Sequence, residues 1–120
     1  MKTLQEAFNK MYVHLMTQKV RSEGIDGGCA YRGADGRQCA IGCLIEDEYY
    51  LPEIEGTTNQ NGLVIFAIKL SGWDIDSKSL QVYTHMQDVH DRISPEDWQE
   101  LLGELARIYE LTIPEMENTL

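Results

Sequence analysis

The fold prediction depends most on residues 29–45, which read CAYRGADGRQCAIGCLI. Asp35 and Gly36 form a dipeptide typical of tight turns, because glycine accepts the positive φ that a short chain reversal requires. Short segments flank this turn on both sides, so we predict an antiparallel β-hairpin over residues 29–40. A short helix is expected directly after it.

Helical patterns surround this hairpin. Residues 3–6, Thr-Leu-Gln-Glu, match a capping box, and the apolar spacing behind them predicts a helix over residues 4–20. Residues 94–97, Ser-Pro-Glu-Asp, resemble a helix start. The apolar stripe that follows them predicts a last helix with Trp98, Leu101, Leu102, Leu105 and Ile108 on its buried side.

Residues 63–70 fit two structures. Their β-branched members favour a strand, whereas Leu63, Phe66, Ala67 and Leu70 fit one face of a helix. The length of the segment does not decide between the two. We therefore predict an α+β fold, mostly helical with one short hairpin, in a single domain over residues 1–120. Residues 112–120 are expected to form a loose tail.

The composition is that of one globular domain. Hydrophobic residues make up 42% and charged residues 25% of 120 residues, which argues against a disordered chain. No apolar run approaches the roughly 18 residues of a membrane helix. The first residues lack the apolar stretch of a signal peptide, so a cytoplasmic protein without membrane contact is expected.

The net charge of −10 is unevenly distributed. Residues 1–45 carry six basic and four acidic side chains, whereas residues 46–120 carry four basic and sixteen acidic ones, a net charge of −12. Such a surface repels nucleic-acid phosphate and attracts basic protein surfaces, including the grooves in which other proteins bind nucleic acids. Acidity that only keeps the domain soluble is the alternative.

The cysteines and histidines are weak candidates for a metal site. Cys29, Cys39 and Cys43 do not have the paired C-x2-C spacing of zinc knuckles, and His85 and His90 lie five positions apart, on different faces of a helix. Buried reduced thiols and a structural histidine are the simpler interpretation. We therefore predict no metal, no cofactor and no catalytic residue, with a zinc-stabilised module or metal-dependent enzyme as the alternative.

An acidic run is the best candidate for a binding surface. It begins at residue 46 and includes two tyrosines, and aromatic side chains supply contact area while acids steer a basic partner. The candidate partner-binding residues are Glu46, Asp47, Glu48, Tyr49, Tyr50, Glu53, Glu55 and the later Trp73.

The cysteine-containing stretch also carries a resemblance. The pattern C-x-Y-R-x-x-D-G-x-x-C-A-x-G-x-L-I at residues 29–45 resembles a family of small proteins from tailed phages, prophages and their hosts. The runs MQDVHD at residues 86–91 and PEDW at residues 95–98 are similar too, and the resemblance covers about residues 8–111. It implies an origin in a mobile element and favours a helix over residues 63–70, but it implies no activity.

These observations together predict a binding protein rather than an enzyme. The expected function is that of an acidic phage-type protein that binds a host or defence-system protein through its acidic surface and inhibits or modulates it. A protein of structure or assembly that associates with itself, as in a homodimer, is a further alternative.

Overall fold

Helices and short turns account for all the regular structure in the part of the chain that the computed structural model describes, which is residues 2–24, 28–58 and 60–116. The α-helices are α1 (Leu4–Gln18), α2 (Gly62–Leu70), α3 (Ser77–Arg92) and α4 (Trp98–Ile108). The 3-10 turns are η1 (Ala34–Gly36), η2 (Gly42–Leu44), η3 (Asp47–Tyr49), η4 (Pro52–Ile54) and η5 (Pro95–Asp97). None of these helices has the length and apolar character needed to cross a bilayer.

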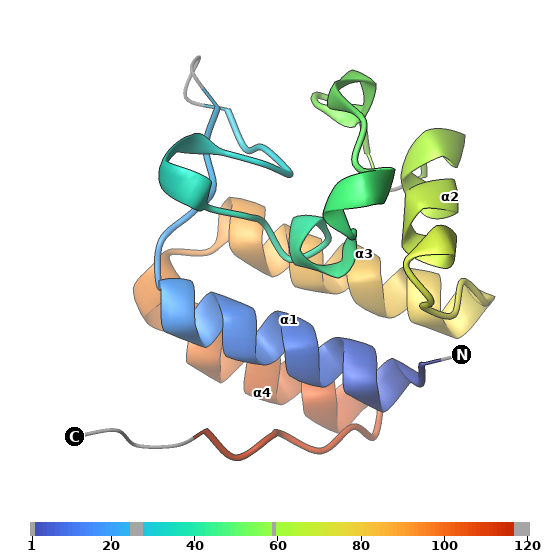
Figure 1. The fold of residues 1–120 in the computed structure, drawn as a ribbon. Coiled ribbons are helices and arrows are strands. Elements are labelled where there is room, and N and C mark those ends of the chain that lie inside the picture. The colour runs from blue at the N-terminus through green and yellow to red at the C-terminus, as the bar shows by residue number, and fades with distance from the viewer. Residues whose placement is uncertain (1, 25–27, 59, 117–120) are drawn as a thin grey trace.

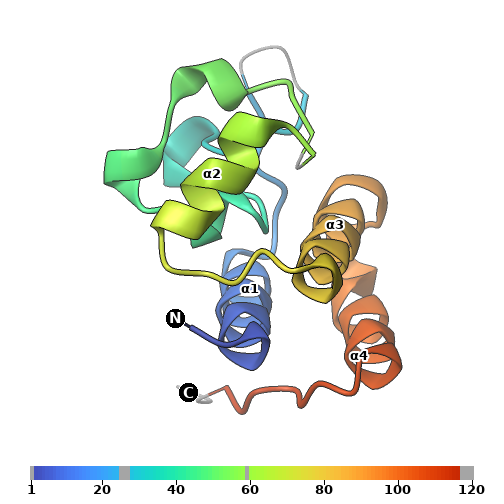
Figure 2. The same cartoon turned by 90° about the vertical axis from the view of Figure 1, so that its right-hand side faces the viewer.

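The molecule has two layers. Helices α1, α3 and α4 pack against one another, and Figure 2 views them nearly end-on at the corners of a triangle. Helix α2 and the turns η1 to η4 form the second layer, which lies over α1 and α3 (Figure 1). One hydrophobic core joins the layers, with Phe8, Met11 and Leu15 of α1 meeting Ile41 and Leu44 of the second layer and Met86 of α3.

Helix α1 confirms the expectation at its start. Thr3 Oγ1 accepts the Glu6 backbone N–H at 3.2 Å, and the Glu6 carboxylate accepts the Thr3 N–H at 3.1 Å, so the capping box is complete. The helix ends at Gln18, because Lys19 takes the left-handed conformation with φ of 61° and its N–H binds the Leu15 carbonyl. That is slightly earlier than predicted.

Helices α2 and α3 begin at side-chain caps, whereas α4 has none. Asn61 Oδ1 accepts the Leu63 N–H at 2.8 Å, which settles residues 63–70 as the helix α2. Asp76 caps α3 by accepting the Ser79 N–H at 2.8 Å. The predicted helix start at Ser94 is instead the turn η5, and α4 follows it.

The apolar stripe of α4 is shorter than predicted. Trp98, Leu102 and Leu105 are buried, but Ile108 is 69% exposed. Beyond α4 the predicted tail is described as far as residue 116, and the Gln5 side chain binds both the N–H and the carbonyl of Thr112 there. Residues 117–120 lie outside the described part.

The predicted β-hairpin over residues 29–40 is wrong, and with it the α+β class. The described residues contain no β-strand, only isolated bridges such as Arg32 to Gln38. The turn itself forms as expected, with Asp35 at φ of 60° and Gly36 at φ of 74°, but the flanking segments do not pair along their length. The described part of the chain is therefore a helical domain.

Side chains take the place of the missing strand pairing. The Glu55 carboxylate accepts the N–H of Tyr31 at 2.9 Å and that of Arg32 at 3.0 Å. Gln18 Oε1 accepts the Gln38 N–H, also at 3.0 Å. Because these amides are satisfied by side chains from outside the segment, no neighbouring strand is needed to bind them.

Two glycines are required by close packing of this segment. A Cβ at Gly42 would lie 2.2 Å from the Tyr31 carbonyl oxygen, and one at Gly33 would lie 2.4 Å from Ser22 Oγ. Neither position has space for a side chain. Gly33 and Gly42 thus allow the backbone of the cysteine stretch to approach Ser22 and Tyr31 closely.

We predict that Glu55→Ala lowers the free energy of unfolding by about 2–4 kcal/mol, because it leaves the Tyr31 and Arg32 amides without their acceptor and removes the 2.6 Å hydrogen bond from the Tyr50 hydroxyl. Urea denaturation followed by circular dichroism measures this loss. Glu53→Ala, at an exposed acid of the same segment, is the control and is expected to change the value by less than about 0.5 kcal/mol. Equal effects of the two substitutions would contradict the assigned role of Glu55.

Candidate functional site

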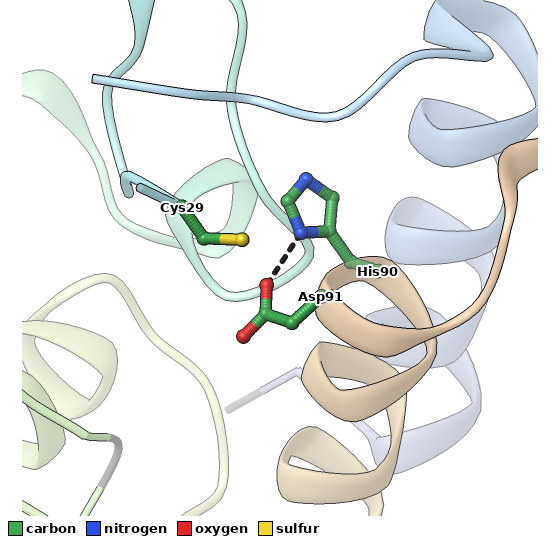
Figure 3. Close-up of side chains that lie close together, drawn as sticks. All are labelled: Cys29, His90 and Asp91. Carbon is green, nitrogen blue, oxygen red and sulfur yellow. Dashed lines mark hydrogen bonds and ion pairs between the residues drawn. The ribbon is translucent and has the colours of Figure 1, made fainter. Parts of the chain in front are cut away.

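A thiol, an imidazole and a carboxylate meet where the distinctive cysteine stretch contacts the end of α3 (Figure 3). Cys29 Sγ, a ring nitrogen of His90 and a carboxylate oxygen of Asp91 all lie within 4.8 Å of one another. Cys29 and Asp91 also line a cavity of about 300 Å³. This is the one group of potential metal ligands in the described part of the chain.

The hydrogen bonds of His90 fix its protonation pattern. Nε2 lies 2.9 Å from the Ser22 backbone nitrogen, whose N–H can only donate, so Nε2 is the unprotonated nitrogen. Nδ1 therefore carries the ring proton and donates it to Asp91 Oδ1 at 2.7 Å. The ring is fully buried and stacks on Trp98 with centroids 5.5 Å apart.

This arrangement does not suit a metal ion. A histidine that binds a metal through one nitrogen donates the N–H of the other nitrogen to an acceptor. A metal on Nδ1 of His90 would move the proton to Nε2, where it would face the Ser22 N–H. Two donors would then meet in a buried place, which is unfavourable.

The remaining weak metal candidates lie apart from this group. Cys39 and Cys43 are buried, and they bind backbone groups of their own segment: Cys39 Sγ accepts the Gly42 N–H at 3.3 Å and Cys43 Sγ donates to the Ala40 carbonyl at 3.0 Å. His85 Nδ1 lies 2.7 Å from the Tyr109 hydroxyl. The structure thus brings together Cys29 and His90, and it adds Asp91, which was not among the weak metal candidates.

The Cys29 thiol is poorly suited to act as a nucleophile. Burial of the sulfur and the neighbouring Asp91 charge, with a hydrogen bond to that carboxylate, raise the pKa of Cys29 to about 11. Burial also acts to raise the pKa of Asp91, but hydrogen bonds from His90 and Cys29 outweigh it and lower that pKa. At neutral pH Cys29 is therefore a protonated thiol beside a carboxylate, not a thiolate.

Gln87 connects this group to the second layer. Its Oε1 accepts the Ile41 N–H at 3.0 Å, and its Nε2 donates to Asp91 Oδ1 at 2.8 Å. Sequence reasoning missed this role, although Gln87 belongs to the run MQDVHD that carries part of the resemblance. The whole cluster holds the cysteine stretch against α3, which is a structural task.

The predicted acidic surface is partly exposed and partly internal. Four acidic side chains in and just before the turns η3 and η4 are exposed. We call them the acidic rim: Glu46, Asp47, Glu48 and Glu53. Glu55 is occupied by the amides described above, and Tyr50 donates to it. Trp73 is only 4% exposed, and its Nε1 binds the Leu44 carbonyl, so its ring is not available to a partner.

Two of the rim acids have basic neighbours. Lys2 Nζ lies 4.0 Å from the Glu46 carboxylate, and Arg32 is paired with Asp47. No ion pair involves Glu48 or Glu53 within the described residues, so their charges are the least compensated of the rim.

An exposed apolar surface adjoins the rim, and the sequence did not indicate it. Leu63, Phe66 and Leu70 of α2 are 46%, 57% and 44% exposed, and Leu51 of the facing segment is 43% exposed. We call these four residues the α2 face. With Glu48 and the half-buried Tyr49 they line a pocket of about 170 Å³. The helical spacing of Leu63, Phe66 and Leu70 could have indicated this surface. It was not recognised, because residues 63–70 also fitted a strand.

Comparisons of this chain with models of known protein families, with curated proteins and with solved structures gave no match. The geometry alone therefore distinguishes the two regions. In the Cys29 cluster only His90 is buried, and its two ring nitrogens are bound by Ser22 and Asp91, whereas Cys29 is exposed. The side chains of the rim and the α2 face are exposed and make fewer internal contacts.

We predict that Cys29 of the folded protein reacts with Ellman's reagent at pH 8 roughly 10- to 100-fold more slowly than free cysteine, because a thiol with a pKa of about 11 is almost wholly protonated there. Cys39 and Cys43 are buried and are expected to react only after unfolding. Asp91→Asn removes the neighbouring charge, which lowers the pKa of Cys29 and is expected to increase the reaction rate of its thiol several-fold. Asp88→Asn, in the same cavity wall, is the control and leaves the rate unchanged. Identical rates in the Asp91 variant and the wild type would contradict the assignment.

Proposed function

We propose that this protein binds a host or defence-system protein through the acidic rim and the α2 face, and modulates or inhibits that partner by covering a basic part of its surface. One observation carries the proposal: four large apolar side chains of a small domain are exposed beside four exposed acids. Contiguous exposed apolar surface with a polar border is typical of protein interaction sites. The resemblance to phage and prophage proteins supports the choice of a host-cell partner in the cytoplasm.

The charge of the rim selects the class of partner. Acidic side chains attract a basic surface and accelerate its approach, and apolar side chains supply the contact that persists after encounter. The same acids repel nucleic-acid phosphate, so direct binding of DNA or RNA is disfavoured. A basic nucleic-acid-binding groove of another protein is the kind of surface that such a domain masks.

The Cys29 cluster gives less support to an enzyme or a zinc-stabilised module. His90 is saturated by Ser22 and Asp91, and the Cys29 thiol is held protonated. Neither group is free to bind a metal or attack a substrate without breaking these bonds. Binding is therefore the function that the geometry favours.

A charge-matched pair of variants tests the proposal. The rim variant replaces Glu46, Asp47, Glu48 and Glu53 by their amides, and the control variant does the same at four exposed acids near α4, Glu96, Asp97, Glu100 and Glu104. Both lose the same amount of charge, but α4 lies on the far side of the molecule from η3 and η4 (Figure 1). Circular dichroism establishes that both fold.

We expect the wild type and the control variant to retain the same protein from bacterial host lysate at about 50 mM salt and to release it at about 500 mM, where charges are screened. The rim variant is expected to lose it. The partner is then purified, and titration is expected to show at least a tenfold weaker affinity for the rim variant than for the control. Equal affinities of the two variants would show that the rim does not bind the partner.

A further inference from the structure

Helix α2 is apolar on both sides, although only one side meets the core. Val64, Ala67 and Ile68 are buried, while Leu63, Phe66 and Leu70 face outward. A helix at the surface of a monomer ordinarily carries polar residues on its outer side. The outer side of α2 therefore has the composition of a buried surface without being buried.

The dimensions of the α2 face suit another helix. Leu63, Phe66 and Leu70 occupy positions i, i+3 and i+7, so they form a row about 10 Å long, which is the length of roughly two helical turns. The pocket of about 170 Å³ beside this row is lined by Tyr49, Leu51 and the α2 residues. An apolar cavity of about 150 Å³ accommodates a benzene molecule, so this pocket has room for one large apolar side chain.

The surrounding charges indicate which charged side chains the bound helix should carry. Glu48 lines the pocket itself, Glu53 is exposed on η4 close to Leu51 in the chain, and neither has an ion-pair partner among the described residues. Lys69 is the single basic residue of α2. An occupant with lysine or arginine beside its apolar row thus finds opposite charges. A second copy of this chain, bound symmetrically through the same surface, would instead bring two acidic rims of like charge together.

An extended peptide has less to bind. Addition of a strand requires the free edge of a sheet, and the described residues contain only isolated bridges. The α2 face offers side chains in a row, which is the arrangement that receives an amphipathic helix in a groove.

We propose that the α2 face binds an amphipathic helix of the partner protein, with one bulky apolar side chain in the pocket beside Phe66 and basic residues next to Glu48 and Glu53. This inference rests on the proposed function and specifies which element of the basic partner is recognised.

Two fluorescein-labelled synthetic peptides of 18 residues test it by fluorescence anisotropy. Both consist of leucine and lysine in the same proportions, but one has leucines at helical spacing and the other has them scrambled. We expect the amphipathic peptide to bind at least tenfold more tightly than the scrambled one. Phe66→Ser is expected to weaken that binding at least tenfold, and Glu48→Gln with Glu53→Gln to weaken it and flatten its salt dependence.

The matched control is Ile108→Ser, which removes a 69% exposed apolar side chain from α4 and is expected to leave binding unchanged. Equal binding of the two peptides, or equal effects of Phe66→Ser and Ile108→Ser, would overturn the helix-binding inference while leaving the attraction of the rim for basic chains intact. Absence of binding by both peptides at low salt would overturn the inference and count against the proposed function as well.

Discussion

The second layer of this domain depends on the Glu55 carboxylate. Its two oxygens accept the amides of Tyr31 and Arg32, and one of them also accepts the Tyr50 hydroxyl. A backbone amide that is removed from water without an acceptor costs about 1–3 kcal/mol, so an irregular segment can pack against a core only if such acceptors are supplied. Glu55, Gln18 and Gln87 supply them here, and the irregular layer is stable without a sheet.

The same interaction explains what the sequence could predict and what it could not. The start of α1 was predictable because Thr3 and Glu6 bind each other within one turn. The turn at Asp35 and Gly36 was predictable because these two adjacent residues themselves favour the positive φ angles that it requires. The irregular structure of the segments on either side of the turn was not predictable. The acceptors of their amides are Glu55 and Gln18, and no local pattern reveals those roles.

The candidate binding surface shows the same division. The acidic run indicated exposed charge at Glu46, Asp47, Glu48 and Glu53, and the structure exposes all of them. Trp73 and Glu55 carry the residue types of a binding surface but serve the interior. The α2 face could be recognised only after residues 63–70 were known to be helical, since a helix and a strand present different residues outward. Side-chain type indicates chemistry, and the backbone decides which side chains a partner can reach.

The long separation of the bonded residues also orders the folding of the chain. The Ile41 amide binds Gln87, which lies 46 positions later, and the Ser22 amide binds His90, which lies 68 positions later. During synthesis the cysteine stretch leaves the ribosome before α3 is made, so its Ile41 amide is bound by water until Gln87 is available. Because contacts of such separation form only after long loops have closed, the attachment of this layer to α3 is expected to form late in folding. A chain truncated before Gln87 would therefore lack the side-chain acceptors of the Ile41 and Ser22 amides.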